Sequence, residues 1–219
     1  MTFIEEIIEA TNDIWEQYLE QPFPTGVVQG TIDKELFKNY IVEDSIYLNE
    51  YARVFGAGML NSRRKSDIMF FYQALNFLEE SEGSTRLYYL KQFGLTDEWI
   101  ESQQARPTNV AYTEYMLSVA REGTPLEILM AVLPCILSYG YTFRELVAKY
   151  GLDESNPYAK LVNDYIGDGY FQYCYLCGKF ANKLAGEINM TDEYKQKLIE
   201  IFRQGSLYEV KFWDMANTR

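Results

Sequence analysis

Apolar side chains recur every three to four residues along most of the chain, which is the spacing that gathers them on one face of an α-helix. Two stretches show the pattern clearly, with apolar positions at Phe3, Ile7, Ile8, Ile14, Trp15, Tyr18 and Leu19, and at Leu36, Tyr40, Ile41, Tyr47, Leu48 and Tyr51. The alternation of apolar and polar residues that is typical of a β-strand is hard to find. The pattern therefore predicts an all-α protein.

Glycine and proline divide this pattern into about seven or eight helices. The interruptions fall at Pro22, Pro24, Gly26, Gly56, Gly58, Gly83, Gly94, Pro107, Gly123 to Pro125, Gly151 to Pro157 and Gly186 to Thr191. The predicted helices cover 3–20, 33–55, 64–93 with a break near 83, a short turn at 97–103, 109–122, 125–150, 157–185 and 192–215. Since no repeat or linker stands out, we expect residues 1–219 to form a single domain, a helical bundle with its site between helices.

The composition is that of a globular protein, with 47% hydrophobic residues and a formal net charge of −12. This charge repels phosphate backbones, so nucleic acid is not an expected partner. No stretch approaches the roughly 20 apolar residues of a membrane span, and Glu5, Glu6 and Glu9 stand where a signal peptide would be basic and then apolar. Three cysteines, an odd number, do not suggest a disulfide framework. We expect a cytoplasmic protein that makes no membrane contact.

The chain contains no histidine, which excludes Ser-His-Asp triads, Cys-His dyads, the common zinc sites and a proximal haem ligand. Acid–base chemistry therefore falls to carboxylates and tyrosines, and we expect neither a metal nor another cofactor. The 19 tyrosines offer flat apolar faces that carry hydroxyl groups, which suits a pocket for a flat polar ring.

The most unusual stretch places Pro134 inside a long helical pattern, where it removes a backbone donor and should kink the helix. Cys135 follows it and Tyr139 lies one turn later on the same face, so that a thiol and a phenol can project into one cavity. A free cysteine is more often a small buried apolar residue than a nucleophile. Spacing alone makes Cys135 a candidate nucleophile and no more.

Two carboxylates have mostly apolar neighbours. Asp44 shares a helix face with Tyr47, and their neighbours suggest that this face points inward, although an aspartate at the edge of an apolar stripe is more often solvated or salt-bridged. Glu209 is surrounded by aromatic residues, with Trp213 one turn later. Apolar surroundings raise the pKa of a carboxyl group and let it exchange protons near neutrality, although a surface glutamate fits the local pattern as well.

A single CxxC motif, Cys174 to Cys177, has no second pair and no histidine to complete a four-ligand zinc site. Structural packing is the favoured interpretation of both thiols. The surrounding stretch from Tyr165 to Tyr175 is rich in aromatic residues and is expected to be mostly core, with one tyrosine facing the site.

Five motifs occur in a fixed order: Asp44-x-x-Tyr47-Leu48, Tyr112-Thr-x-Tyr115, Pro134-Cys135-x-x-x-Tyr139, Asn156-Pro157 with Tyr165 downstream, and Tyr208-Glu209-x-x-Phe212-Trp213. Together they resemble the thiaminase II (TenA) family over nearly the full length. The resemblance implies a helical bundle of the haem-oxygenase-like type, usually a homotetramer, that binds a small aminopyrimidine or thiamin.

By that resemblance, Cys135 matches the family nucleophile and Glu209 its general acid and base. Asp44 matches the carboxylate that holds the pyrimidine amino group and ring nitrogen. The tyrosines that stack on the ring or hydrogen-bond around the cysteine are matched by Tyr47, Tyr112, Tyr139 and Tyr165. The implied reaction is hydrolysis of 4-amino-5-aminomethyl-2-methylpyrimidine to the 5-hydroxymethyl compound and ammonia, and more broadly of thiamin to pyrimidine and thiazole, in thiamin salvage. Asp44, Tyr139 and Glu209 are the candidates for the group that activates the thiol.

The chain departs from many relatives at Leu137, where they carry an aromatic residue, at Leu161, where they carry tryptophan, and at Arg86 and Leu87, where they carry a histidine. These changes leave the substrate preference between thiamin and the aminopyrimidine open. Two other functions remain to be weighed. A haem oxygenase or iron-dependent oxidase of the same fold would lack its histidine ligands here. A non-catalytic ligand sensor or transcriptional regulator would lack a helix-turn-helix signature and a basic face.

Overall fold

Helices form all the regular structure of the part of the chain that the computed structural model describes, which is residues 1–218 except for the side chains of 79–82. They are α1 (Phe3–Glu9), α2 (Asn12–Tyr18), α3 (Pro22–Gln29), α4 (Lys34–Asn61), α5 (Lys65–Phe93), α6 (Asp97–Glu101), α7 (Pro107–Glu122), α8 (Pro125–Tyr150), α9 (Ala159–Ile166), α10 (Asp168–Gly186) and α11 (Asp192–Ala216). The predicted all-α fold is confirmed.

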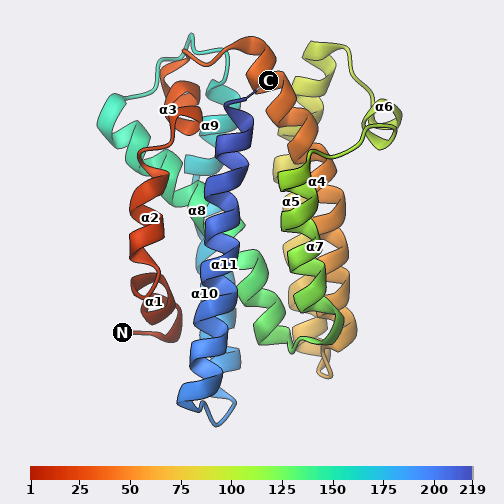
Figure 1. The fold of residues 1–219 in the computed structure, drawn as a ribbon, viewed down its shortest axis with the longest axis vertical. Helices are drawn as coiled ribbons and strands as arrows, with labels where there is room; N and C mark the ends of the chain where they lie inside the picture. Colours follow the sequence, from red (N-terminus) through yellow and green to blue (C-terminus); the bar gives the residue numbers. More distant parts are fainter. Residues whose placement is uncertain (219) are drawn as a thin grey trace.

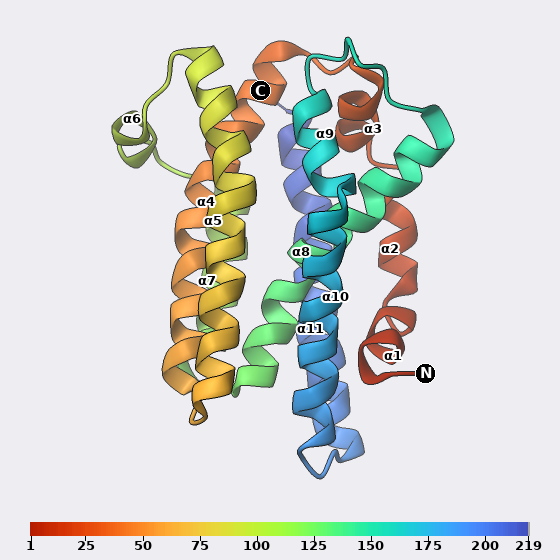
Figure 2. The ribbon, with the colours of Figure 1, turned by 180° about the vertical axis from the view of Figure 1, so that it is seen from behind.

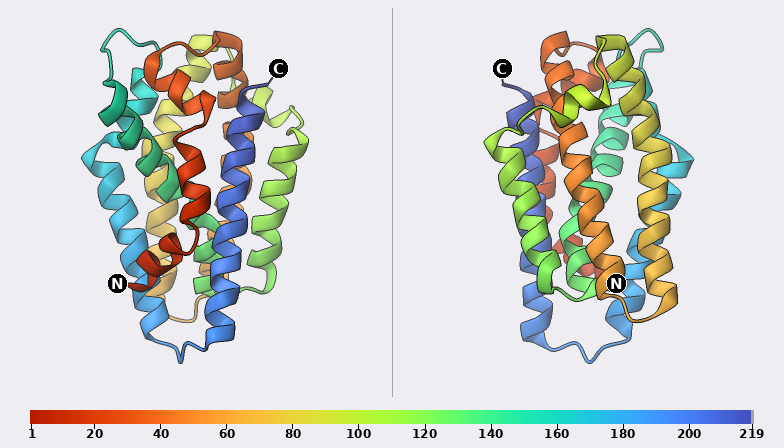
Figure 3. Two further views of the ribbon diagram at one scale, coloured as in Figure 1. Left: turned by 60° about the vertical axis from the view of Figure 1, so that its left-hand side comes forward. Right: turned by 90° about the vertical axis from the view of Figure 1, so that its right-hand side faces the viewer.

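The long helices run side by side along the long axis of the molecule (Figure 3). Helices α4, α5 and α7 form one side of the bundle, while α1, α2 and α3 follow the opposite edge (Figures 1 and 2). Helix α8 slants between these two groups and packs against α2, α3, α4, α7, α9, α10 and α11. Its position in the middle brings its side chains within reach of nearly every other long helix.

The start and end of α8 agree with the predicted segment 125–150. A capping box begins the helix, since the Thr124 side chain accepts from the Glu127 N–H and the Glu127 side chain accepts from the Thr124 N–H. Gly151, with a φ of 73°, ends it. This helix is also the one described helix that is long and apolar enough to cross a membrane, but 83% of its most apolar stretch is buried inside the bundle. Core packing accounts for its apolar character.

The segment 3–20 is two helices, so the prediction of one continuous helix was wrong. The backbone of Thr11 departs from helical geometry, with φ −123° and ψ 12°, and its hydroxyl donates to the carbonyls of Ile7 at 3.0 Å and Ile8 at 3.1 Å at the end of α1. The chain therefore turns between α1 and α2. Apolar spacing continues across this turn, which is why the pattern did not reveal it.

The prolines and glycine near residue 22, predicted to interrupt helices, instead form α3. Pro22 occupies the first turn, where a missing N–H leaves no hydrogen bond unmade. The helix ends at Gly30, with a φ of 71°, and Asn156 donates 2.9 Å hydrogen bonds to the carbonyls of Val27 and Val28. A side chain from a distant loop thus stabilises the end of this helix.

Four other glycines behave differently from the prediction. Helix α5 continues through Gly83, and α4 continues through Gly56 and Gly58. An added Cβ at Gly58 would lie 2.5 Å from the ring of Phe71 on α5. Close packing of α4 against α5 therefore offsets the helix penalty of glycine, which is about 1 kcal/mol. The predicted helix 157–185 is instead divided at Gly167, whose extended backbone separates α9 from α10.

Helix α8 continues on both sides of Pro134, and the proline ring packs against Gly205 of α11. A Cβ at position 205 would lie 2.8 Å from Cγ of Pro134, well inside a normal carbon–carbon contact. Only glycine therefore lets the two helices approach this closely.

Replacing Gly205 with alanine should lower the free energy of unfolding by about 1–3 kcal/mol, because the proline ring or α11 must move away. The matched control is Gly56→Ala within α4, where no atom lies within 4 Å of an added Cβ. That change should raise stability by about 0.5–1 kcal/mol. Urea unfolding of both variants measures the difference. Equal free energies of unfolding for Gly205→Ala and Gly56→Ala would show that the α8–α11 contact is not tight.

Candidate active site

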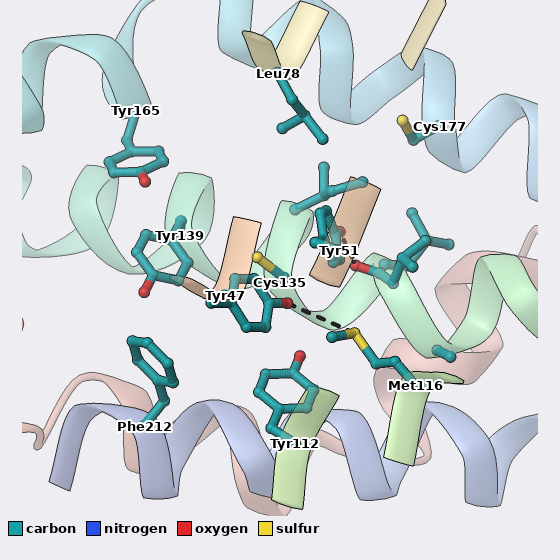
Figure 4. Packing of buried hydrophobic residues seen from close by; sticks show 14 of the residues in the cluster. Tyr47, Tyr51, Leu78, Tyr112, Met116, Cys135, Tyr139, Tyr165, Cys177 and Phe212 are labelled. Atoms are coloured by element: carbon teal, nitrogen blue, oxygen red, sulfur yellow. Dashed lines mark hydrogen bonds between the residues drawn. The ribbon is translucent and has the colours of Figure 1, made fainter. Parts of the chain in front are cut away.

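Cys135 lies in the middle of the bundle, with tyrosines from three helices around it (Figure 4). Its residue is 9% exposed, and Tyr47, Tyr112 and Tyr139 are all less exposed than that. Tyr139 comes from the next turn of α8, whereas Tyr47 belongs to α4 and Tyr112 to α7. The thiol and the phenol of α8 thus lie among the tyrosines of α4 and α7.

Glu209 on α11 is the carboxyl group next to this thiol. It accepts a hydrogen bond from the Tyr112 hydroxyl at 2.6 Å and also hydrogen-bonds with Cys135. Burial raises the pKa of Glu209 to about 8, although both hydrogen bonds favour the charged form. The carboxyl therefore exchanges its proton near neutral pH, and it does so beside a thiol.

The phenols of the site keep their protons at neutral pH. Burial raises the pKa of Tyr47, Tyr112 and Tyr139 well above the usual value for tyrosine. They can therefore donate hydrogen bonds, as Tyr112 does to Glu209, but they do not act as bases near neutrality. This leaves carboxylates to accept the thiol proton.

Asp44 is buried on the inward face of α4, as its spacing with Tyr47 predicts, and it is 9% exposed. Burial raises its pKa to about 7, and the positive charge of Arg86 lowers it. It lines an enclosed cavity of about 10 Å³, roughly the space for one water molecule. The other lining residues are Ile41, Thr85, Arg86, Leu161, Asp164 and Tyr165. A ring can enter only when some of these side chains move.

Tyr165 links this cavity to the cysteine. Its ring lines the cavity and contacts the ring of Tyr139, with 4.8 Å between the ring centroids. Tyr139 in turn feels the charges of Asp44, Glu209 and Cys135, so these groups lie within electrostatic reach of one another. The structure thus brings together all seven residues that the sequence selected: Asp44, Tyr47, Tyr112, Cys135, Tyr139, Tyr165 and Glu209.

Several neighbours of these residues were not selected from the sequence. Tyr40 donates to the Tyr139 hydroxyl at 3.2 Å, and Tyr51 stacks on Tyr47 with 5.2 Å between the ring centroids. Both lie four residues from a selected residue on the inward face of α4, and that spacing could have identified them. Met116 accepts from the Tyr47 hydroxyl at 3.7 Å, a contact between helices that no local pattern reveals.

The CxxC cysteines lie on α10 and serve the packing, as predicted. All three cysteines of the chain are free thiols. Cys174 donates to the carbonyl of Ile136 at 3.5 Å, and burial raises the pKa of Cys177. Among the described residues, no group of three or more Cys, Asp or Glu side chains could hold a metal ion.

These features define a class: all-α proteins with a buried cysteine that hydrogen-bonds with a carboxyl group inside a ring of tyrosines. Residues 8–219 match the TENA/THI-4/PQQC family. The chain belongs to this family.

Relatives that are named as enzymes match along nearly the whole chain. The aminopyrimidine aminohydrolase of Halalkalibacterium halodurans is 30% identical over 217 residues, which cover 99% of this chain and 96% of that protein. The aminopyrimidine aminohydrolase of Bacillus subtilis is 30% identical over 219 residues, covering 99% of this chain and 90% of that protein.

Solved structures confirm the fold. A TenA family transcription regulator from Silicibacter superposes with a TM-score of 0.88 at 24% identity, covering 99% of this chain and 97% of that one. A domain of unknown function with a haem-oxygenase-like fold, from Shewanella denitrificans, reaches a TM-score of 0.71 at 16% identity, covering 97% of this chain and 91% of that one. The predicted haem-oxygenase-like bundle is therefore confirmed.

Proposed function

We propose that the protein is an aminopyrimidine aminohydrolase of thiamin salvage, which converts 4-amino-5-aminomethyl-2-methylpyrimidine and water to the 5-hydroxymethyl compound and ammonia. The observation that carries this proposal is the hydrogen-bonded pair of Cys135 and Glu209, buried among tyrosines within electrostatic reach of Asp44. Relatives named aminopyrimidine aminohydrolase match over nearly their full length, which supports it. Hydrolysis of thiamin to the same pyrimidine and a thiazole is the second reaction that this site would perform.

Substrate binding is proposed to use Asp44 and the tyrosine rings. The amino group and adjacent nitrogen of an aminopyrimidine form an edge that a carboxylate recognises with paired hydrogen bonds. The ring would lie between aromatic faces of Tyr47, Tyr139 and Tyr165, and Tyr112 would hold Glu209 in place through its 2.6 Å hydrogen bond. In this role Asp44 must be ionised, so binding should strengthen as the pH rises through about 7.

The first chemical step is proposed to be addition of the Cys135 thiolate to an electron-poor carbon of the pyrimidine ring. The thiol proton passes to the Glu209 carboxylate, with which the thiol already hydrogen-bonds. The new C–S bond interrupts the aromatic system, and the electron pair moves onto the ring nitrogens. Asp44, hydrogen-bonded to that edge, stabilises the altered charge distribution.

The second step releases the amine. The ring electrons expel the aminomethyl nitrogen, and Glu209 donates to it the proton taken from the thiol, so that ammonia leaves as a neutral molecule. Glu209 is again a carboxylate and removes a proton from water, whose oxygen bonds to the exocyclic carbon. Cleavage of the C–S bond then restores the aromatic ring and the Cys135 thiolate, which regains its proton.

The proposed assembly is a homotetramer. Helix α10 carries three large apolar side chains that are each about half exposed: Phe171, Tyr175 and Leu176. Further copies of the chain would cover them in the assembly.

The test is direct assay of the purified protein with the aminopyrimidine and with thiamin at equal concentrations. We expect ammonia release from the first compound to be the faster reaction, because a small flat ring requires less movement of the side chains around Asp44 than thiamin does. Chromatography of the pyrimidine product measures both reactions on one scale. No turnover of either compound would overturn the proposed function.

A further inference from the structure

Arg86 of α5 faces the cavity that Asp44 of α4 lines. Among the described residues that line this cavity, it alone carries a positive charge. Its side chain is 16% exposed, so water screens its charge only in part. The positive charge of the Arg86 guanidinium therefore acts on the cavity, which Asp44 also lines.

A second carboxylate holds Arg86 at this place. One of its terminal nitrogens lies 2.7 Å from Oδ1 of Asp97, at the start of α6. Asp97 is 54% exposed, so water screens this ion pair and its energy is small. The ion pair with Asp97 orients the Arg86 side chain. It does not neutralise the positive charge that Arg86 presents to the cavity.

Other ionisable groups lie near Asp44 on three neighbouring helices. They are Asp164 and Tyr165 from α9, Tyr139 from α8 and Glu209 from α11. Asp164 accepts a hydrogen bond from Thr85, and burial raises its pKa. None of these groups carries a positive charge. Arg86 is therefore the neighbour that favours the charged form of Asp44, against the cost of burial.

We propose that Arg86 is a positioning residue of the active site, which keeps Asp44 in the carboxylate form that receives the amino edge of the pyrimidine. This role rests on the proposed function, because it takes an aminopyrimidine as the ligand of Asp44. It gives Arg86 no contact with the reacting atoms. Arg86 changes only the fraction of protein molecules in which Asp44 is ionised and can bind the pyrimidine.

The test compares binding of the hydroxymethyl product to the wild type and to Arg86→Gln by calorimetry between pH 6 and pH 9.5. Loss of a nearby opposite charge raises the pKa of a carboxyl group by about one unit or more, and each unit is about a tenfold change in its ionised fraction. The variant should therefore bind about tenfold more weakly at pH 6, and its affinity should equal that of the wild type by pH 9.5. A loss that is the same at every pH, or no loss at all, would overturn the proposal.

Two control variants separate charge from structure. Arg86→Lys keeps the positive charge and should restore most of the affinity at pH 6. Arg53→Gln removes a cation that pairs with Glu50 at 2.6 Å on the surface of α4, and it should leave the affinity unchanged at every pH. Failure of the lysine variant to restore binding would also count against the proposal.

A measurement without ligand keeps this inference separate from the proposed function. Carbon-13 NMR of proteins labelled at aspartate follows the titration of Asp44 directly, with Asp44→Asn to assign its signal. A higher pKa for Asp44 in Arg86→Gln supports the role of Arg86 even when no aminopyrimidine binds, and an unchanged pKa overturns it. Absence of binding to the wild type at every pH would overturn the proposed function alone.

Discussion

Replacement of Cys135 by serine should lower turnover of the aminopyrimidine by about three orders of magnitude or more, while the fold and much of the affinity persist. A serine hydroxyl fits the same space and can still hydrogen-bond with Glu209. It is a far weaker acid than a thiol, so the site would hold almost no anion able to add to the ring. Ammonia release under saturating substrate, together with calorimetric affinity for the product, measures the two effects separately.

The matched control is Cys174→Ser on α10. That thiol donates to the carbonyl of Ile136 at 3.5 Å, a bond that a serine hydroxyl can also make, and it is not one of the seven residues selected for the site. Its activity should stay within about twofold of the wild type. Near-normal ammonia release by Cys135→Ser would show that Cys135 is not the nucleophile.

Glu209→Gln should lower kcat by about 10²- to 10⁴-fold, which is the usual contribution of a positioned acid–base group. The amide still accepts the hydrogen bond from Tyr112, so the site keeps its geometry, but it can neither take the thiol proton nor give it to the leaving amine. The pH profile gives the sharper result. In the wild type, kcat/KM should rise as Glu209 loses its proton near pH 8, and this rise should be absent in the variant.

Glu43→Gln is the control for this change. Glu43 is a buried glutamate of α4 that accepts hydrogen bonds from Asn109 at 2.8 Å and from the Arg106 N–H, outside the cysteine site. Its replacement should leave the pH dependence of kcat/KM unaltered. A Glu209→Gln variant that retained the wild-type profile would remove Glu209 from the proton transfers.

The raised pKa of Glu209 also predicts how stability depends on pH. Because the folded protein holds this proton more tightly than the unfolded chain, the group favours folding below pH 4.5 and loses that contribution as the pH rises through about 8. At pH 9 the wild type carries a buried charge that Glu209→Gln lacks. The variant should therefore gain stability over the wild type between pH 5 and pH 9, by a few kcal/mol in order of magnitude. Urea unfolding at several pH values checks this trend.

The apolar periodicity predicted the long helices well because burial of one face determines where they lie. The segment 125–150 forms α8 with the same bounds, and the inward direction of Asp44 followed from its neighbours. Short helices were harder to predict. The turn at Thr11 lies within a continuous apolar pattern, and the end of α3 is stabilised by Asn156, which is remote in the sequence.

The chemistry of the site depends on contacts that no single segment contains. Composition showed that carboxylates and phenols must replace histidine, but the pairing of Cys135 with Glu209 joins α8 to α11. The electrostatic effect of Arg86 on Asp44 likewise joins α5 to α4, and the local pattern around Arg86 shows only a solvated cation. The resemblance carried by the order of motifs implied roles for Cys135 and Glu209, whereas nothing in the sequence predicted that Arg86 acts on Asp44.

The contact between Gly205 and Pro134 lies one residue before Cys135 on α8 and one turn before Glu209 on α11. A close fit between two residues without reactive groups therefore sets the register in which Cys135, the proposed nucleophile, meets Glu209, the proposed proton carrier. Under the proposed function, a substitution at position 134 or 205 would disturb the reaction although neither residue takes part in it.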